Sequence, residues 1–282
     1  MWGKDRQGLR EELSKRLQEH FDEALEYFDK TNIVCLSLQG SQNYGLDTPS
    51  SDVDTKLVVT PSLKDIVMNK PAVSTTYVRA NDEHIDFKDI RLMFNTFRKQ
   101  NLNFLEILFT EYFIINPLYE AEWGELRANG ERIAHYNIYS AVKAMRGHAL
   151  EKYNALEHPY PSRMAVFEKY QYDPKQLHHL LRIEDYLKRY IAGDSYADCL
   201  HPIPSIRDYL IEVKEGLYNI NRAKEVANEA IRNIDEMTKQ FTKDSDYNKN
   251  DVYVDELLDS VQERIMTKSI QRELEVRKEE KC

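Results

Sequence analysis

The chain has 282 residues, 41% of them hydrophobic, which is enough apolar material for one large domain or two small ones. It carries 39 basic and 48 acidic residues, and a net charge of −9 argues against extended, non-specific binding of long nucleic acids through their phosphates. A membrane-spanning helix needs a run of about 18 or more apolar residues, and the sequence has none, so no membrane span is expected.

The three cysteines, Cys35, Cys199 and Cys282, lie far apart and show no Cys-x-x-Cys spacing. This usage fits a reducing compartment and argues against a structural zinc site. The expected location is therefore the cytoplasm.

The pattern of apolar residues changes once along the chain. A helical period over 6–29 precedes the first strand. The expected strands cover 33–39, 52–60, 75–79 and 83–88, with a short helix at 62–68. From residue 90 onward almost everything is helical, with helices expected at 90–99, 102–108, 118–128, 133–156, 174–191, 219–242 and 252–278. The sequence thus predicts an α+β domain over residues 1–120 and an all-α domain over residues 121–282.

A glycine and a serine follow the first expected strand. Gly40 and Ser41 can bring backbone N–H groups and a hydroxyl close to phosphate oxygens. Tyr44 and Gly45 then either close the turn, with Tyr44 packing on the sheet, or contact a bound nucleotide. This segment is a candidate phosphate loop.

Two carboxylates open the second expected strand. Because side chains alternate along a strand, Asp52 and Asp54 are predicted to share one face. Such a pair is repulsive without a cation, and oxygen-only ligands suit Mg²⁺ or Mn²⁺ shared with substrate phosphates. Lys56 falls on the same face, as either an ion-pair partner or a phosphate contact.

The order strand, Gly-Ser, about ten residues and Asp-x-Asp resembles the signature of the DNA polymerase β-like nucleotidyltransferase superfamily. The resemblance implies a mixed-sheet core and a third metal-binding carboxylate on a later strand. Asp86, in His84-Ile85-Asp86-Phe87, matches that position best, with Asp82 and Asp89 as close competitors.

A second group of candidate residues lies in the helical part. Asp173 can cap a helix with Pro174 at its first position. Lys175, His179 and Arg182 then follow at i, i+4 and i+7 on one face, which suits either a triphosphate or a solvated surface.

Such a helix resembles one in a branch of predicted bacterial and phage nucleotidyltransferases that carry an α-helical C-terminal domain. The segment Asn101-Leu102-Asn103-Phe104-Leu105-Glu106-Ile107-Leu108-Phe109 is similar to another segment of that branch. The resemblance covers about 33–190. His148 is a further candidate for the cleft between the domains, although a single histidine on a helix is more often structural.

The resemblance implies metal-dependent transfer of a nucleoside monophosphate from an NTP or dNTP to a hydroxyl acceptor, with release of pyrophosphate. The identity of the acceptor stays open between a small molecule, a protein side chain, an RNA 3′ end and another nucleotide. Two Mg²⁺ or Mn²⁺ ions would be bound by Asp52, Asp54 and Asp86, with Asp86 at the ion nearest the acceptor. Gly40, Ser41, Tyr44, Lys175, His179 and Arg182 would bind the nucleotide. Two alternatives remain: a synthase that joins nucleotides into an oligonucleotide or signalling molecule, and a catalytically silent nucleotide-binding regulatory module.

Overall fold

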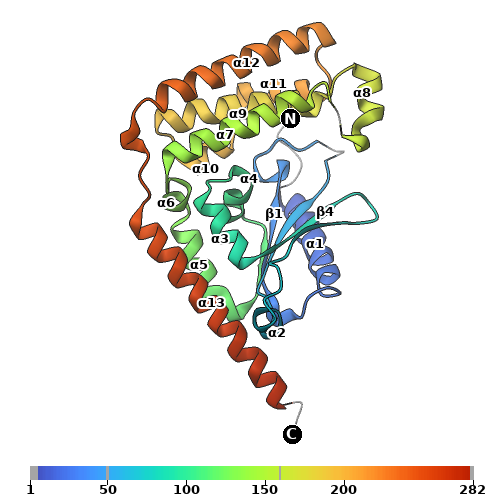
Figure 1. Ribbon diagram of the computed structural model, residues 1–282. Helices are drawn as coiled ribbons and strands as arrows, with labels where there is room; N and C mark the ends of the chain where they lie inside the picture. The colour runs from blue at the N-terminus through green and yellow to red at the C-terminus, as the bar shows by residue number, and fades with distance from the viewer. Residues whose placement is uncertain (1–5, 49–50, 159, 280–282) are drawn as a thin grey trace.

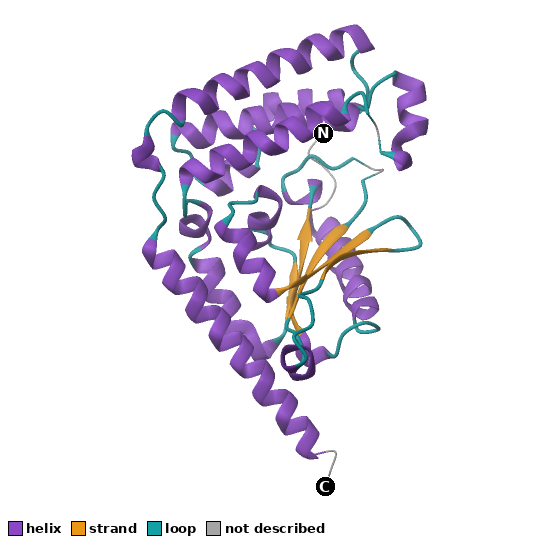
Figure 2. Cartoon of the chain, viewed as in Figure 1, coloured by secondary structure: helices purple, strands orange, loops and turns teal. Residues whose placement is uncertain are grey.

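The computed structural model describes residues 6–48, 51–158 and 160–279 (Figure 1). Within this part of the chain a five-stranded sheet lies among helices, as Figure 2 shows in orange and purple. The strands are β1 (Ile33–Gln39), β2 (Asp54–Val59), β3 (Ser74–Val78), β4 (His84–Asp89) and β5 (Phe113–Ile115). The first four were expected, whereas β5 is a three-residue strand too short to leave a pattern in the sequence.

The strand order is β3-β4-β2-β1-β5, and the sheet is mixed. The β2–β4 pair is parallel, and the β1–β2, β1–β5 and β3–β4 pairs are antiparallel. In this register Asp54 lies opposite Gln39, and Lys56 lies opposite Asp86. The ends of three strands therefore bring their polar residues together.

The two faces of the sheet differ in chemistry. Helix α1 (Arg6–Ala24) covers one face, where Leu36, Leu57 and Phe87 belong to a buried apolar cluster. The opposite face carries Asp54, Lys56 and Asp86 near one end of the strands, because side chains alternate along each strand. Figure 1 shows α1 on one side of the sheet and α3 and α4 on the other.

The helices after β4 form the rest of the molecule. They are α3 (Ile90–Arg98), α4 (Leu102–Leu105), α5 (Glu120–Ala128), α6 (Gly130–Ala134), α7 (Ile138–Ala155), α8 (Met164–Tyr170), α9 (Pro174–Ala192), α10 (Tyr196–Leu200), α11 (Pro204–Lys214), α12 (Ile220–Phe241) and α13 (Val252–Glu279). A short helix, α2 (Leu63–Val67), follows β2. The predicted fold class, an α+β core with a mixed sheet followed by an α-helical region, is confirmed.

Several predicted boundaries need correction. The helix expected over 133–156 is divided between two helices, α6 and α7. Asn137 caps the start of α7, because its side chain accepts a hydrogen bond from the Ser140 N–H. The helix expected over 102–108 becomes a 3₁₀ turn from Glu106. The second strand begins at Asp54, since the carbonyl of Asp52 accepts a hydrogen bond from the Gln42 side chain and not from a neighbouring strand.

The helical region packs closely on the sheet. Helix α9 lies between α7, α11 and α12, and one apolar cluster runs from Val34 and Val58 in the sheet to Leu177 and Ile234 in the helices. Helix α13 returns along α3 and α5, as the long red helix in Figure 1 shows. The division into two domains at residue 120 stays a prediction.

No helix in the described ranges is long and apolar enough to cross a membrane. Cys35 and Cys199 are buried and not disulfide-bonded, whereas Cys282 lies outside the described residues. Burial raises the pKa of the Cys35 thiol far above its usual value.

Candidate functional site

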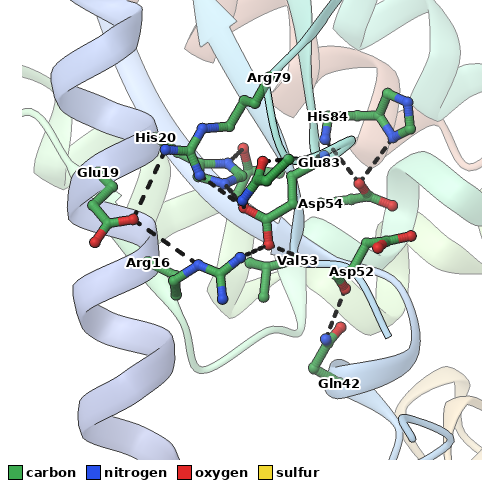
Figure 3. Close-up of polar contacts among 12 residues, drawn as sticks. Arg16, Glu19, His20, Gln42, Asp52, Val53, Asp54, Arg79, Glu83 and His84 are labelled. Atoms are coloured by element: carbon green, nitrogen blue, oxygen red, sulfur yellow. Dashed lines mark hydrogen bonds and ion pairs between the residues drawn. The ribbon is translucent and has the colours of Figure 1, made fainter. Parts of the chain in front are cut away.

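The acid pair lies where the chain enters β2. The Oδ1 atom of Asp54 accepts a hydrogen bond of 3.0 Å from the His84 backbone N–H and lies 3.1 Å from Nδ1 of the same residue. The Asp52 side chain is exposed just before the strand. In Figure 3 the carboxylates of Asp52 and Asp54 both extend away from α1.

A buried carboxylate holds the backbone between these two aspartates. Glu83 Oε1 accepts a hydrogen bond of 3.0 Å from the Val53 N–H. The same carboxylate forms ion pairs with Arg16 and with Arg79, the latter at 2.7 Å, and lies 3.0 Å from His20 Nε2. Figure 3 shows Glu83 at the centre of this group. The charged cluster therefore fixes the start of β2 from the side facing α1.

Asp86, the predicted third carboxylate, is already paired. Its Oδ2 atom lies 3.0 Å from Lys56 Nζ and accepts a hydrogen bond of 3.2 Å from Gln39, while Oδ1 accepts one of 2.6 Å from Thr76. Burial raises the pKa of Asp86, but the Lys56 ammonium and the hydrogen bonds outweigh it and lower the pKa overall. Of the two roles considered for Lys56, ion-pair partner and phosphate contact, the structure displays the first.

Asp89 and Asp82, the other two candidates for the third metal-binding carboxylate, lie in different environments. Asp89 is buried, caps α3 through the Arg91 N–H, and binds the Arg91 guanidinium at 2.6 Å. Asp82 is exposed in the turn between β3 and β4, with a positive φ of 65°. Of the three candidates, Asp86 is the one next to β2 on the face that carries Asp54.

The donor set of the acid pair suits a divalent cation in part. Asp52 and Asp54 supply carboxylate oxygens of the kind that Mg²⁺ takes together with water and phosphate oxygens. Among the described residues no group of three His, Cys, Asp or Glu side chains is arranged to hold a metal ion. Lys56 neutralises Asp86, so a second ion at Asp86 requires that this pair opens.

The glycine of the candidate phosphate loop has a different partner from the one expected. Gly40 has a φ of 91°, a conformation that favours glycine, and its N–H donates to Glu106 Oε1 at 3.1 Å. Burial raises the pKa of Glu106 to about 7, against the opposing effect of Arg182 and Lys56. Glu106 thus occupies the backbone donor that Gly40 was expected to offer to phosphate.

Glu106 had no predicted role, although it belongs to the Asn101–Phe109 segment that resembles the known branch. Its signal in the sequence is an acid within an apolar run, Leu105-Glu106-Ile107-Leu108. All four of these side chains are buried, so the acid must find polar partners inside the protein.

Tyr44 and Arg182, far apart in sequence, are in contact. The guanidinium carbon of Arg182 lies 3.5 Å from the centre of the Tyr44 ring, which is a cation–π contact. Both side chains are buried, and the Nε atom of Arg182 has no hydrogen-bond partner among the described residues. This part of the predicted nucleotide-binding set is therefore assembled by the fold.

Tyr44 and Arg182 line a cavity of about 120 Å³ together with His179. The other lining residues are Leu102, Asn103, His148, Lys152 and Ile183. Burial lowers the pKa of His179 well below its usual value, and the nearby His178, Lys175 and Arg182 lower it further. Lys175 is not among the lining residues.

Lys175 is instead close to a lysine that the sequence analysis missed. Lys214, at the end of α11, donates to the Leu46 carbonyl at 3.1 Å and to Ser51 Oγ at 3.0 Å. Burial lowers the pKa of Lys214, Lys175 lowers it further, and the charges of Asp47 and Asp52 oppose them. Lys214 thus lies within electrostatic reach of both Lys175 and Asp52.

No family model matches the chain, and no curated protein matches it. Among solved structures, the chain is similar to a nucleotidyltransferase-like protein from Exiguobacterium sibiricum, with 12% identity. The match covers 81% of this chain and 75% of that chain, with a TM-score of 0.29.

Proposed function

We propose that this protein is a metal-dependent nucleotidyltransferase that moves a nucleoside monophosphate from an NTP or dNTP to a hydroxyl acceptor and releases pyrophosphate. One observation carries the proposal: the carboxylates of Asp52 and Asp54 extend from the start of β2 away from α1, and Lys214, which donates to Ser51, lies within electrostatic reach of Asp52. A divalent cation bound to a triphosphate satisfies both sets of charges at once.

Each residue has a defined task in this proposal. Asp52 and Asp54 would hold the cation, which when bound neutralises phosphate oxygens and lowers the pKa of an acceptor hydroxyl. Ser41 offers a hydroxyl to the phosphates, and Lys175 and Lys214 stabilise the negative charge that grows on the leaving pyrophosphate. The Glu83 cluster keeps the Asp52–Asp54 backbone in place before substrate arrives.

The first experiment replaces the acid pair. We expect Asp52→Asn combined with Asp54→Asn to abolish Mg²⁺-dependent pyrophosphate release, because the variant removes both carboxylates from the expected cation site. The measurement is pyrophosphate released after incubation with all NTPs and dNTPs, with mass spectrometry of the protein and of the small-molecule products. Asp82→Asn, an exposed acid in the β3–β4 turn, is the matched control and should keep wild-type activity.

The products of the same incubation separate the alternatives. Unchanged pyrophosphate release in the double variant would contradict the proposed role of the acid pair. Products longer than one nucleotide would identify a nucleotide-joining synthase.

One observation favours a silent binding module. Asp86 is paired with Lys56, and the Gly40 N–H donates to Glu106, so neither is available to a metal ion or a phosphate. The expected result for such a module is tight binding of ATP with Mg²⁺ and no pyrophosphate release from the wild type. Pyrophosphate release by the wild type would exclude it.

A further inference from the structure

The cavity beside Tyr44 combines residues from distant parts of the sequence, between positions 44 and 183. Tyr44 comes from the loop after β1, Asn103 from α4, His148 and Lys152 from successive turns of α7, and Arg182 from α9. All of the titratable residues among its lining are basic or aromatic, and none is a carboxylate. The lining therefore suits an anion and does not suit a metal ion.

The charges around the cavity are only partly balanced. Lys152 lies 2.9 Å from Glu151, whose carboxylate is about half exposed, and His148 lies 3.4 Å from the same carboxylate. Arg182 is 8% exposed, and its Nε–H has no hydrogen-bond acceptor among the described residues. Because Arg182 is one of the lining residues, an anion in the cavity would lie next to a buried positive charge.

We propose that this cavity binds a phosphate group, and that the group belongs to the acceptor. Size favours a single phosphate, because complete small-molecule sites have roughly 300–1,000 Å³ and this cavity has about 120 Å³. A guanidinium, an ammonium, imidazole N–H groups and the Asn103 amide are the donors that phosphate oxygens take. A whole nucleoside triphosphate does not fit.

The assignment to the acceptor rests on the proposed function, whereas phosphate binding does not. Under that function Lys175 and Lys214 serve the triphosphate near Asp52, which leaves the cavity without a ligand. The cavity is close to the acid pair, because the charge of Asp54 reaches Tyr44. A phosphorylated acceptor anchored there would bring its hydroxyl to the same end of the sheet.

The first test measures binding of inorganic phosphate to the full chain by isothermal titration calorimetry, in EDTA and without nucleotide. We expect saturable binding, weakened about tenfold or more by Lys152→Met and by Arg182→Lys, since each loses a charge-assisted contact. Lys143→Met, which removes an exposed lysine from the same helix α7, should bind like the wild type.

Two results would overturn phosphate binding in the cavity: no saturable binding to the wild type at millimolar phosphate, or equal weakening by Lys152→Met and Lys143→Met. Because these titrations contain neither metal nor nucleotide, they succeed or fail independently of pyrophosphate release. Lys152→Met also keeps the test valid if the buried Arg182 variant does not fold.

The second test distinguishes the acceptor from the NTP. The phosphate titration is repeated with a saturating non-hydrolysable ATP analogue and Mg²⁺. If the cavity serves the acceptor, the dissociation constant for phosphate stays within about twofold, as expected for independent sites. Displacement of phosphate by the analogue would assign the cavity to the nucleotide and overturn the acceptor assignment.

Discussion

Two buried charged groups lie on opposite sides of the acid pair, and they differ in how far their polar atoms are satisfied. On the α1 side, Glu83 is 2% exposed and is bonded to two arginines, a histidine, an asparagine and the Val53 N–H. On the helical side, Arg182 is 8% exposed and lines a cavity, and its Nε–H has no acceptor among the residues that the structure describes.

The contrast separates structure from binding. A buried charge whose partners are all supplied by the protein stabilises one backbone conformation, and here it positions the residues around Val53. A buried charge that lines a cavity can instead contact a ligand that the protein itself does not supply. Breaking the first group should therefore cost stability, and changing the second should cost binding.

The largest effect is expected at Glu83. Replacement by glutamine leaves the Arg16 and Arg79 guanidiniums without their buried counter-ion, which should lower the free energy of unfolding by about 3–5 kcal/mol. Urea denaturation measures the loss. Glu19→Gln is the matched control: this exposed acid lies 4.0 Å from Arg16 and 3.8 Å from Arg79, and its loss should cost less than about 1 kcal/mol. Equal losses in the two variants would contradict a central role for Glu83.

The next effect is a pH dependence that arises from His20. Burial and the charge of Arg79 lower the pKa of His20 from 6.5 to about 4, even though Nε2 lies 3.0 Å from Glu83, because two arginines already neutralise that carboxylate. Between pH 6.5 and about 4, His20 is protonated in the unfolded chain but stays neutral in the folded protein. Stability should thus fall between pH 6.5 and about 4, by about 3 kcal/mol for this group.

The measurement is the free energy of unfolding of the wild type and of His20→Gln across this pH range. Burial lowers the pKa of His178 to about 4 as well, so the wild type contains both contributions and the difference between the two proteins isolates His20. We expect the variant to lose less stability on acidification. If Glu83 held His20 in its charged form, the wild type would instead gain stability relative to the variant as the pH falls.

The smallest effect on stability is expected at the cavity. Lys152→Met removes a cation that is paired with the half-exposed Glu151, so unfolding should change by no more than about 0.5 kcal/mol. Millimolar phosphate should raise the melting temperature of the wild type and have little effect on that of the variant. A large loss of stability in phosphate-free buffer would place Lys152 with the structural charges and remove the contrast between the two groups.

Local patterns predicted much of this molecule. The apolar run of β1 and the alternation of β4, with Ile85 and Phe87 on one face and His84 and Asp86 on the other, are visible in the sequence because strand geometry imposes them. Asp173 and Pro174 start α9 as expected, since capping depends on neighbours a few residues away. No helix was predicted at α8, α10 or α11; α8 and α10 have only 7 and 5 residues, whereas α11 has 11.

The partners of the charged residues were not predictable in the same way. Glu106 binds Gly40 across 66 positions, and Lys214 binds Ser51 across 163. No local period connects such pairs. Both roles were missed for this reason, although Glu106 belongs to the marked Asn101–Phe109 segment.

The amino-acid sequence alone thus identified the acids, the glycine–serine loop and the basic helix face, because residue type and short-range spacing decide which chemistry a segment can offer. Folding decided which of these groups meet. In the folded protein Asp86 pairs with Lys56, and the Gly40 N–H donates to Glu106. Arg182 contacts the Tyr44 ring beside a cavity. The physical reason is that a charge is neutralised by whatever lies within a few ångströms of it in space, and distance along the chain does not set that neighbourhood.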